Sequence, residues 1–493
     1  MELPAIKSIR LALSLASAVT VTGLIGCVSN PATGGSDFVL MSEEQEIELG
    51  EQYRQQVLKS FKVYPDDSLQ DYVNFVGQRL AAVSERSHLN FTFTVLDDDK
   101  VNAFTLPGGH VYITRGILAH MGSEAELAAV LGHEIGHTTA RHIVRQHSGS
   151  TVMSTLGAIA SAVTGSSAAG SATNYAGAAL VQGYSRKHEL EADTLSARYL
   201  ARVGYEPDAM IEIIDILKQQ EKFEIERARL EGRDPKIYHG FFASHPDADT
   251  RLYEAVEEAK VYGTGNPAMS RPTFFLRKLE GIKYGNTDTG VLRGDTFYHS
   301  TLGIKINFPD GWAIQNRGAL IAMSPQEDAI LRVSAANMSK SLTPRSFLVR
   351  DLKVARLRDG RDVTIAGMEA YIGIADETKS PFGRRPVRYA VVFDDRNGQV
   401  YVFEGAGKYD QTSLAADRYF IATIFSLDYM KPKDHSIAKP PSLHLVTAEP
   451  GTTMEALAAK TPIADYPVQK LRLLNGMYPD GQPEAGKIIK TVR

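Results

Sequence analysis

Two histidines and a glutamate at helical spacing are the residues of this chain best suited to chemistry. Residues 133–137 read His-Glu-Ile-Gly-His, so His133 and His137 stand four positions apart and share one face of a helix. Two neutral imidazoles can hold a zinc ion, and Glu134 beside the first can take a proton from a water molecule at the metal. The alternative is two core histidines that share this spacing by chance.

The helix that must carry these residues has a recognisable beginning. Ser123 can cap it, and Glu126, three positions later, completes the pattern of a capping box. The apolar residues that follow, up to Gly132, continue the helix into the histidine pair. The sequence therefore predicts one helix that begins at Ser123 and carries both imidazoles on one face.

A two-histidine site is incomplete, and a carboxylate from another helix is the expected third ligand. Glu189 and Asp193 are four residues apart, hence on one helical face, whereas Glu191 points to another. We expect Glu189 to bind zinc and Asp193 to accept the outer N–H of a ligating histidine. His188 points about 100° away from Glu189 around the helix, so it is left out of the ligand set. For a Glu/Asp pair alone, a solvated helix face would be the better interpretation.

Taken together, these motifs resemble the gluzincin metalloproteases of the CAAX prenyl protease, HtpX and BepA type. The resemblance covers about residues 40–260 and includes four stretches in the family's order: Asn102 to Gly109, the HExxH motif, Ser185 to Asp193, and Ser244-His245-Pro246 with Arg251. It implies one zinc ion per chain and peptide-bond hydrolysis. It also departs from the family at Thr105, where alanine is usual. The paired-helix repeats of the BepA type are not evident after residue 260.

The resemblance also brings His245 and Arg251 to the site as catalytic residues. The proline after His245 keeps its backbone out of the helical region. An imidazole near zinc can donate a hydrogen bond to the oxyanion, as Arg251 can, or it can replace the water and hold the enzyme silent. A third alternative is a histidine that only packs its loop.

Composition and the first residues suggest where the protein acts. The net charge of −4 gives no reason to expect nucleic-acid binding. Lys7 and Arg10 precede an uncharged apolar run that ends at Cys27, the single cysteine of the chain. This pattern resembles a bacterial lipoprotein signal, with lipid attached to Cys27; an uncleaved membrane anchor is the alternative. Because Val28 rather than aspartate follows, the resemblance implies the outer membrane rather than the inner one, with the chain on the periplasmic side.

The rest of the chain divides into an α+β arrangement of several parts. We expect a signal peptide at 1–27, a linker at 28–41 and a mainly helical zincin domain with a small sheet at 42–265. The strand just before the zinc helix is expected to offer its edge to an extended peptide. An α+β domain at 290–430 follows, with a hairpin at Asn397-Gly398 and no catalytic constellation. Residues 442–493 resemble a LysM unit, which binds peptidoglycan; a packing appendage is the alternative.

The sequence therefore predicts a zinc metalloendopeptidase of the bacterial envelope. Misfolded or unassembled envelope proteins are the substrates that the resemblance implies. The rival hypothesis is an envelope chaperone or peptidoglycan-tethering lipoprotein with a structural zinc site. Such a site would need a fourth protein ligand and would have no use for Glu134.

Overall fold

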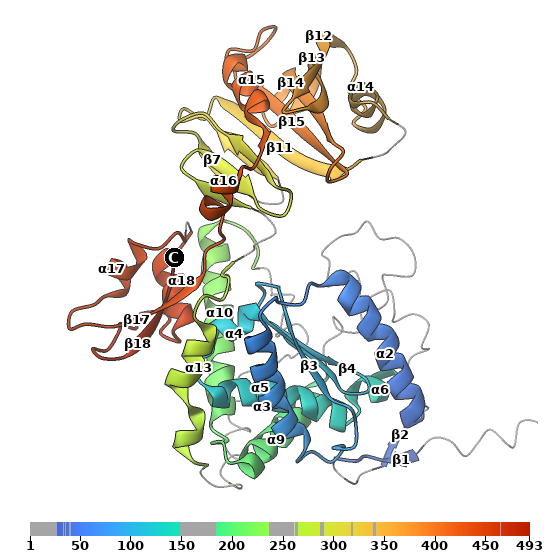
Figure 1. Cartoon of the computed structure of the whole chain (residues 1–493), viewed down its shortest axis with the longest axis vertical. Helices are drawn as coiled ribbons and strands as arrows, with labels where there is room; N and C mark the ends of the chain where they lie inside the picture. Colours follow the sequence, from blue (N-terminus) through green and yellow to red (C-terminus); the bar gives the residue numbers. More distant parts are fainter. Residues whose placement is uncertain are drawn as a thin grey trace, which may run out of the picture. The chain divides into compact units, whose positions relative to one another are not determined.

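A computed structural model describes residues 27–32, 34, 36–38, 41–147, 184–235, 261, 265–285, 290–316, 319–338, 342–463 and 465–493. The chain forms two compact units. The first contains Met1–Gly285 together with Pro441–Arg493, and the second contains Asn286–Pro440. The described part of the first unit carries the zincin-type helix, so it is the unit that matters for the site (Figure 1).

The first unit is mainly helical, as the sequence predicts. Its helices are α2 (Glu43–Ser60), α3 (Asp67–Ala81), α4 (Arg115–His120), α5 (Glu124–Thr139), α6 (His142–His147), α9 (Arg186–Val203), α10 (Ala209–Leu230), the 3-10 turn η1 (Pro267–Ser270) and α13 (Pro272–Leu279). A short pair, β1 (Cys27–Ser29) and β2 (Ser36–Phe38), precedes them and is antiparallel. Helix α5 lies in the middle of this group, and every one of its residues is buried.

The small sheet corrects one expectation about peptide binding. It contains β3 (Thr92–Leu96), β4 (Ala103–Leu106) and β5 (His110–Thr114) in the order β3-β5-β4. Strand β5, the last strand before the HExxH helix, is parallel to β3 and antiparallel to β4. Both of its edges are therefore paired, and the expectation that β5 offers an edge is wrong. Among the described residues, β4 keeps an edge that no other strand occupies.

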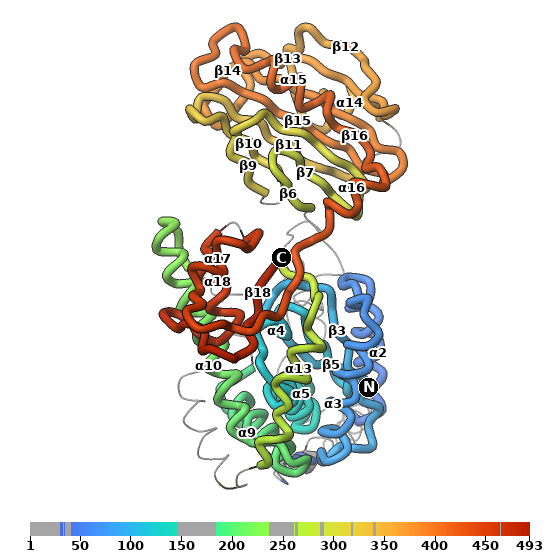
Figure 2. Tube along the Cα trace, turned by 60° about the vertical axis from the view of Figure 1, so that its left-hand side comes forward, coloured from blue at the N-terminus to red at the C-terminus, as the bar shows by residue number. Residues whose placement is uncertain are grey.

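The C-terminal module is part of the same compact unit. It runs through β17 (Leu443–Thr447), α17 (Met454–Ala458), α18 (Pro467–Leu474) and β18 (Ile488–Val492), with β17 antiparallel to β18. Its apolar residues, Leu443, Leu471 and Ile489 among them, belong to one hydrophobic cluster with Val130 and Leu131 of α5. Figure 2 shows α18 beside α10. This packing is what the appendage alternative expects, while glycan binding by a LysM unit stays a prediction.

The second unit is an antiparallel α+β structure with two sheets. Seven strands follow the order β12-β13-β14-β15-β11-β10-β9, and four follow the order β16-β8-β7-β6. Their bounds are β6 (Val291–Arg293), β7 (Thr296–His299), β8 (Ile304–Asn307), β9 (Ala313–Asn316), β10 (Leu320–Met323), β11 (Ala329–Asn337), β12 (Leu357–Ile365), β13 (Met368–Ser380), β14 (Gly383–Asp394), β15 (Gln399–Gly407) and β16 (Asp428–Tyr429). The helices are α14 (Pro344–Ser346), the π-helix η2 (Phe347–Asp351), α15 (Asp417–Ser426) and α16 (Pro432–Ile437).

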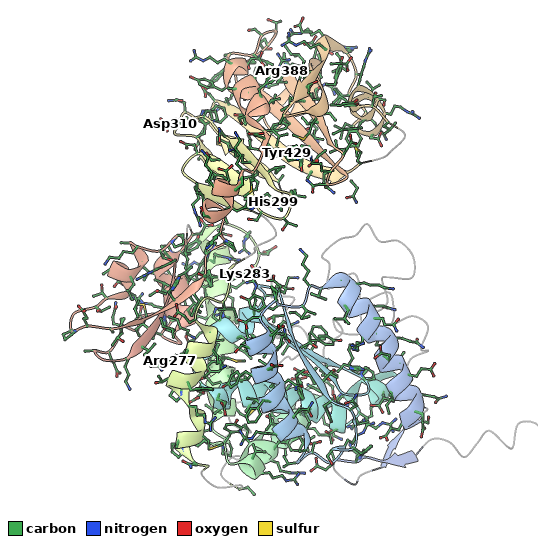
Figure 3. The ribbon with its side chains drawn as sticks, viewed as in Figure 1. Arg277, Lys283, His299, Asp310, Arg388 and Tyr429 are labelled. Carbon is green, nitrogen blue, oxygen red and sulfur yellow. The ribbon has the colours of Figure 1, made fainter. Side chains whose placement is uncertain are left out.

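Two polar contacts tie the helical and terminal parts of this unit to its sheets. Arg388 of β14 makes two hydrogen bonds of 2.7 Å to the Asp417 carboxylate at the start of α15. The hydroxyl of Tyr429, which is labelled in Figure 3, donates to Asp394 at 2.8 Å, near the turn that carries Asn397-Gly398. That turn joins antiparallel β14 and β15, which confirms the predicted hairpin.

In the part of the chain that the structure describes, no helix has both the length and the apolar character needed to cross a membrane.

Candidate metal centre

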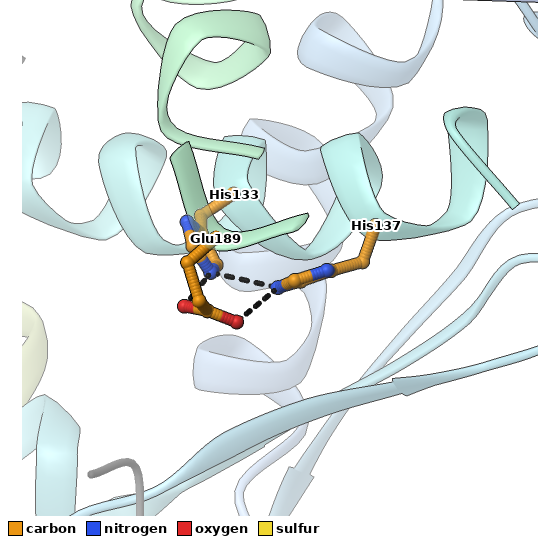
Figure 4. Close-up of side chains that lie close together, drawn as sticks. All are labelled: His133, His137 and Glu189. Atoms are coloured by element: carbon orange, nitrogen blue, oxygen red, sulfur yellow. Dashed lines mark hydrogen bonds and ion pairs between the residues drawn. The ribbon is translucent and has the colours of Figure 1, made fainter. Parts of the chain in front are cut away.

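The HExxH helix and the following long helix bring three metal-binding side chains together. His133 and His137 come from α5, and Glu189 comes from the first turn of α9. One ligand atom from each lies within 4.8 Å of the other two (Figure 4). All three side chains are buried, and so is Glu134. Among the described residues, this is the one group of histidine, cysteine or acidic side chains close enough to share an ion.

The geometry of the three ligands suits zinc. The two histidine Nε2 atoms are 2.9 Å apart. Glu189 places one carboxylate oxygen 3.4 Å from His137 Nε2 and the other 3.6 Å from His133 Nε2. A tetrahedral zinc ion with bonds of about 2.0–2.2 Å separates its ligand atoms by roughly 3.3–3.5 Å. The donor types and the two Glu189 distances therefore fit one zinc ion with room for a further ligand, while the two histidine nitrogens lie closer together than zinc-bound nitrogens would.

Two glycines in α5 allow α9 to come close enough for Glu189 to reach the histidines. A Cβ atom on Gly136 would lie 3.0 Å from the Ala192 carbonyl oxygen, and one on Gly132 would lie 2.6 Å from the Ser196 hydroxyl. That hydroxyl donates to the Ala129 carbonyl, at 2.8 Å, which fixes the two helices against each other. The glycine inside the HExxH motif thus has a packing role, because a side chain there would push the third ligand away.

Asp193 lies where the sequence expects it, one turn after Glu189. Its Oδ1 atom is 2.7 Å from His133 Nδ1, and both side chains are buried. When Nε2 of a neutral imidazole faces the metal, the proton is on Nδ1, so His133 donates to Asp193. This contact holds the ring in the orientation that presents Nε2 to the ligand group.

The other histidine has a different partner, one that sequence reasoning missed. His137 Nδ1 is 2.7 Å from Nδ1 of His142, the first residue of α6. Burial lowers the pKa of His142, although Glu191 partly opposes that shift. The Tyr184 ring stacks on His137 with centroids 3.8 Å apart. Burial, followed by the charges of Glu134 and Glu189, raises the pKa of Tyr184. The available signals were the histidine five positions after His137 and the tyrosine just before α9.

The N-terminal end of α5 is fixed partly as expected. The Ser123 hydroxyl accepts a hydrogen bond from the Glu126 N–H. The returning half of the capping box is replaced, because the Glu126 carboxylate accepts from the Gly122 N–H at 2.8 Å. Lys490 of β18 donates to the Met121 carbonyl just before this cap, at 2.7 Å. The C-terminal module therefore contacts the start of the metal-bearing helix.

The C-terminal end of α5 is held by buried ion pairs from α2. Glu46 of α2 accepts from Arg86 and from Arg141, in each case at 2.8 Å. Arg86 also donates to the Thr138 carbonyl, at 2.9 Å, next to His137. Arg141 has a positive φ of 56°, and this left-handed residue ends α5 and turns the chain so that His142 faces His137.

Thr105 has a contact that an alanine could not make. Its hydroxyl lies 2.7 Å from the hydroxyl of Thr138 on α5. Both residues are buried, so the bond ties β4 to the helix one residue after His137. The departure from the family pattern therefore adds a link between the strand with the unpaired edge and the metal-bearing helix.

Two of the expected functional residues, and most of the predicted signal peptide, cannot be placed. His245 and Arg251 lie outside the described residues. The signal peptide lies outside them as well, apart from Cys27, whose backbone belongs to β1. The lipid, oxyanion and inhibitory roles therefore stay predictions.

An HExxH helix with a glutamate ligand from a later helix is the arrangement typical of a metallopeptidase domain. Residues 67–259 match the model of peptidase family M48, so this part of the chain is similar to the domain of that family. The match includes both helices that form the ligand group.

Several named proteins are similar to parts of this chain. The beta-barrel assembly-enhancing protease of Escherichia coli strain K12 is 29% identical over 274 residues, which is 54% of this chain and 54% of that protein. The mitochondrial metalloendopeptidase OMA1 of Schizosaccharomyces pombe is 35% identical over 139 residues, 28% of this chain and 41% of that protein. The chain thus spans about half the length of the bacterial relatives it matches. The solved structure of cyanobacterial PsbP from Synechocystis sp. PCC 6803 aligns over 28% of this chain and 95% of its own chain, with 13% identity and a TM-score of 0.22.

Proposed function

We propose that this chain is a zinc-dependent metalloendopeptidase of the bacterial cell envelope. The observation that carries the proposal is the buried group of His133, His137 and Glu189, with Glu134 next to the first ligand in sequence. Three protein ligands leave a place for water or substrate, as catalytic zinc sites do and closed structural sites do not. The family of the domain and the names of its relatives support the same activity.

The residues of the chain divide the work of hydrolysis in a definite way. Zinc bound by the three ligands would supply a Lewis acid for the peptide carbonyl and lower the pKa of a water molecule. Glu134 accepts the proton of the attacking water and later gives it to the leaving amine. Its burial suits this role, because a carboxylate away from bulk water exchanges its proton with the reactants rather than with solvent. His245 or Arg251 would stabilise the oxyanion, or His245 would take the place of the water.

Strand β4 is the element best placed to align an extended peptide. Its unpaired edge, among the described residues, offers backbone hydrogen bonds to a substrate strand. The Thr105–Thr138 bond keeps β4 against α5 close to His137. A peptide on this edge would lie alongside the helix that holds the metal ligands. Backbone pairing of this kind suits unfolded proteins, because it reads extended main chain rather than one sequence.

The substrates we propose are misfolded or unassembled envelope proteins, on the periplasmic side of a lipid anchor. The bacterial relatives carry the name of beta-barrel assembly-enhancing proteases, which supports an envelope role. Lipid on Cys27 is tested by fatty-acid labelling of the parent and of Cys27→Ser. Loss of label and a changed fractionation in Cys27→Ser are expected, while label that persists would show that Cys27 is not the attachment point.

A purified Glu134→Gln variant tests the catalytic proposal. The amide keeps the size of the side chain but cannot accept the proton, so degradation of unfolded casein should fall to background while zinc content stays at the parent level. Casein degradation at the parent rate would refute the proposal. A variant without proteolysis that still prevents aggregation of unfolded proteins as the parent does would favour the chaperone hypothesis instead.

A further inference from the structure

The Nδ1 atoms of the two metal-facing histidines contact different side chains. His133 Nδ1 faces a carboxylate, Asp193, at 2.7 Å. His137 Nδ1 faces another imidazole, that of His142, also at 2.7 Å. An outer partner of a metal-binding histidine fixes its tautomer and ring orientation. His142 thus occupies for His137 the place that Asp193 occupies for His133.

One assignment of protons satisfies the whole line of contacts. If His137 presents the lone pair of Nε2 to a metal, its own proton is on Nδ1 and is donated to His142 Nδ1. His142 then carries its proton on Nε2, which lies 3.2 Å from Glu191 Oε2. The carboxylate of Glu191 accepts the hydrogen bond from Nε2 of His142. Nδ1 of His142 therefore remains the acceptor for His137. Glu191, His142 and His137 thus form a line of hydrogen bonds, here called the relay, that ends at Nε2 of His137.

Glu191 is fixed by two more donors. Arg145 Nη1 lies 2.9 Å from the same oxygen that His142 contacts. The Asn30 amide lies 3.0 Å from the other oxygen. Three donors therefore surround the Glu191 carboxylate and fix it as the acceptor that faces His142.

Asn30 brings the beginning of the described chain into this relay. It is buried, and its own side-chain oxygen accepts from the Ala32 N–H at 2.8 Å, which fixes the amide in a local turn. It follows Cys27 by three residues and lies 161 residues before Glu191. The segment just after Cys27 is thereby connected to His137 through two intervening side chains.

We propose that His142 and Glu191 are positioning residues for His137, and that Asn30 couples the segment after Cys27 to this relay. The inference rests on the proposed zinc peptidase function. The inference also gives Glu191 a role at the metal centre, although the sequence places it on another helix face from Glu189. Glu191 does lie away from the ligand group, but it acts on that group through His142.

The first test measures the zinc affinity of metal-stripped protein by competition with a chelator. His142→Leu removes the acceptor for His137 and should weaken zinc binding roughly 10–100-fold. His142→Asn offers an amide oxygen near the former Nδ1 position and should recover much of the loss. Glu191→Ala should weaken binding in the same direction, Glu191→Gln less so, and Asn30→Ala least. The visible spectrum of the cobalt-substituted protein should shift in His142→Leu and return toward the parent in His142→Asn.

Glu85→Ala is the matched control. Glu85 is a carboxylate that accepts from Tyr199, at 2.6 Å, and from Arg202, at 3.0 Å, both on the helix α9 that carries Glu189. Removing it should destabilise the packing of α9 while leaving zinc affinity within about twofold of the parent. Equal zinc loss in Glu85→Ala and Glu191→Ala would overturn the relay, since general loosening of α9 would then explain both.

Parent-like zinc affinity and cobalt spectrum in His142→Leu would also overturn the inference. If His142→Leu does not fold, the comparison of Glu191→Ala with Glu191→Gln carries the test, because both leave the imidazole in place. These measurements do not depend on proteolysis. Failure of the peptidase proposal would appear in Glu134→Gln, whereas failure of the relay would appear as unchanged metal binding in His142 and Glu191 variants.

Discussion

Lys490 Nζ donates a hydrogen bond of 2.7 Å to the carbonyl oxygen of Met121, and the lysine side chain is buried. The contact joins β18 to the residue that precedes the cap of α5 by two positions. Burial lowers the pKa of Lys490 to about 7, while the charge of Glu126 acts in the opposite direction. Burial likewise raises the pKa of Glu126. The C-terminal module therefore places the amino group of a buried lysine where the metal-bearing helix begins.

We expect Lys490→Met to destabilise the first unit by roughly 1–3 kcal/mol, because it leaves the Met121 carbonyl and the Glu126 carboxylate buried without their cation. The double variant Lys490→Met/Glu126→Gln should recover part of that loss, since it removes the remaining buried charge. Thermal unfolding of the parent, the two single variants and the double variant measures this coupling. A double variant no more stable than Lys490→Met would show that Glu126 is not the partner.

Zinc content distinguishes a residue that binds the metal from a residue that only hydrogen-bonds to a metal ligand. Glu189→Ala removes one of the three ligands and should lower the zinc content of purified protein well below one per chain. Asp193→Ala keeps all three ligands but loses the acceptor for His133, so zinc affinity should fall by roughly 10–100-fold without abolishing the site. Glu221→Ala, an exposed carboxylate on α10, is the control. Full zinc retention by Glu189→Ala would show that the wrong carboxylate was chosen.

Gly136→Ala tests whether close helix contact brings Glu189 to the histidines. The added methyl group would lie about 3 Å from Ala192 backbone atoms, so α9 must move or the structure must bear strain of roughly 1–3 kcal/mol. Zinc affinity should fall even though no ligand has changed. Ala129→Gly, which removes a methyl group from the same helix without a clash, should lower stability but keep zinc. Normal zinc affinity in Gly136→Ala would mean that the approach of α9 is not limiting.

His120 should make the stability of the first unit sensitive to acid. Burial lowers its pKa to about 4, although its bond to the Gly116 carbonyl opposes the shift. The unfolded chain then binds more protons than the folded chain between pH 6.5 and 4, so the free energy of unfolding falls as pH drops through that range, by up to roughly 3 kcal/mol. In His120→Gln, the free energy of unfolding should decrease less between pH 7 and pH 4 than it does in the parent. Identical pH dependence in both proteins would remove His120 as the cause.

His245→Ala separates the three roles that the sequence leaves open. Loss of an oxyanion donor should reduce peptide cleavage by roughly 10²–10³-fold. Loss of a residue that replaces the water should instead raise basal cleavage, and we expect this outcome, because an envelope protease among unfolded proteins needs restraint. The assay uses a peptide substrate at matched zinc occupancy. An unchanged rate would leave His245 with a packing role only.

The chemistry of the centre could be predicted from local spacing. An interval of four residues on a helix places His133 above His137, and Glu189 above Asp193, regardless of the rest of the fold. Residue type then limits what such pairs do, because imidazole and carboxylate are the zinc ligands available here. The same local rules predicted the hairpin at Asn397-Gly398, since these two adjacent residues are a strong turn signal in the sequence alone.

The tertiary structure decided what holds those ligands in place. His142 reaches His137 because Arg141 adopts a left-handed conformation between two helices, and no helical spacing describes that turn. Glu191 and Asn30 meet across 161 residues, and Lys490 reaches Met121 across 369. Strand β5 lies between β3 and β4, so the edges of this sheet belong to β3 and β4 instead. Contacts of this kind depend on how distant segments pack against one another, and periodicity within a segment carries no information about its distant neighbours.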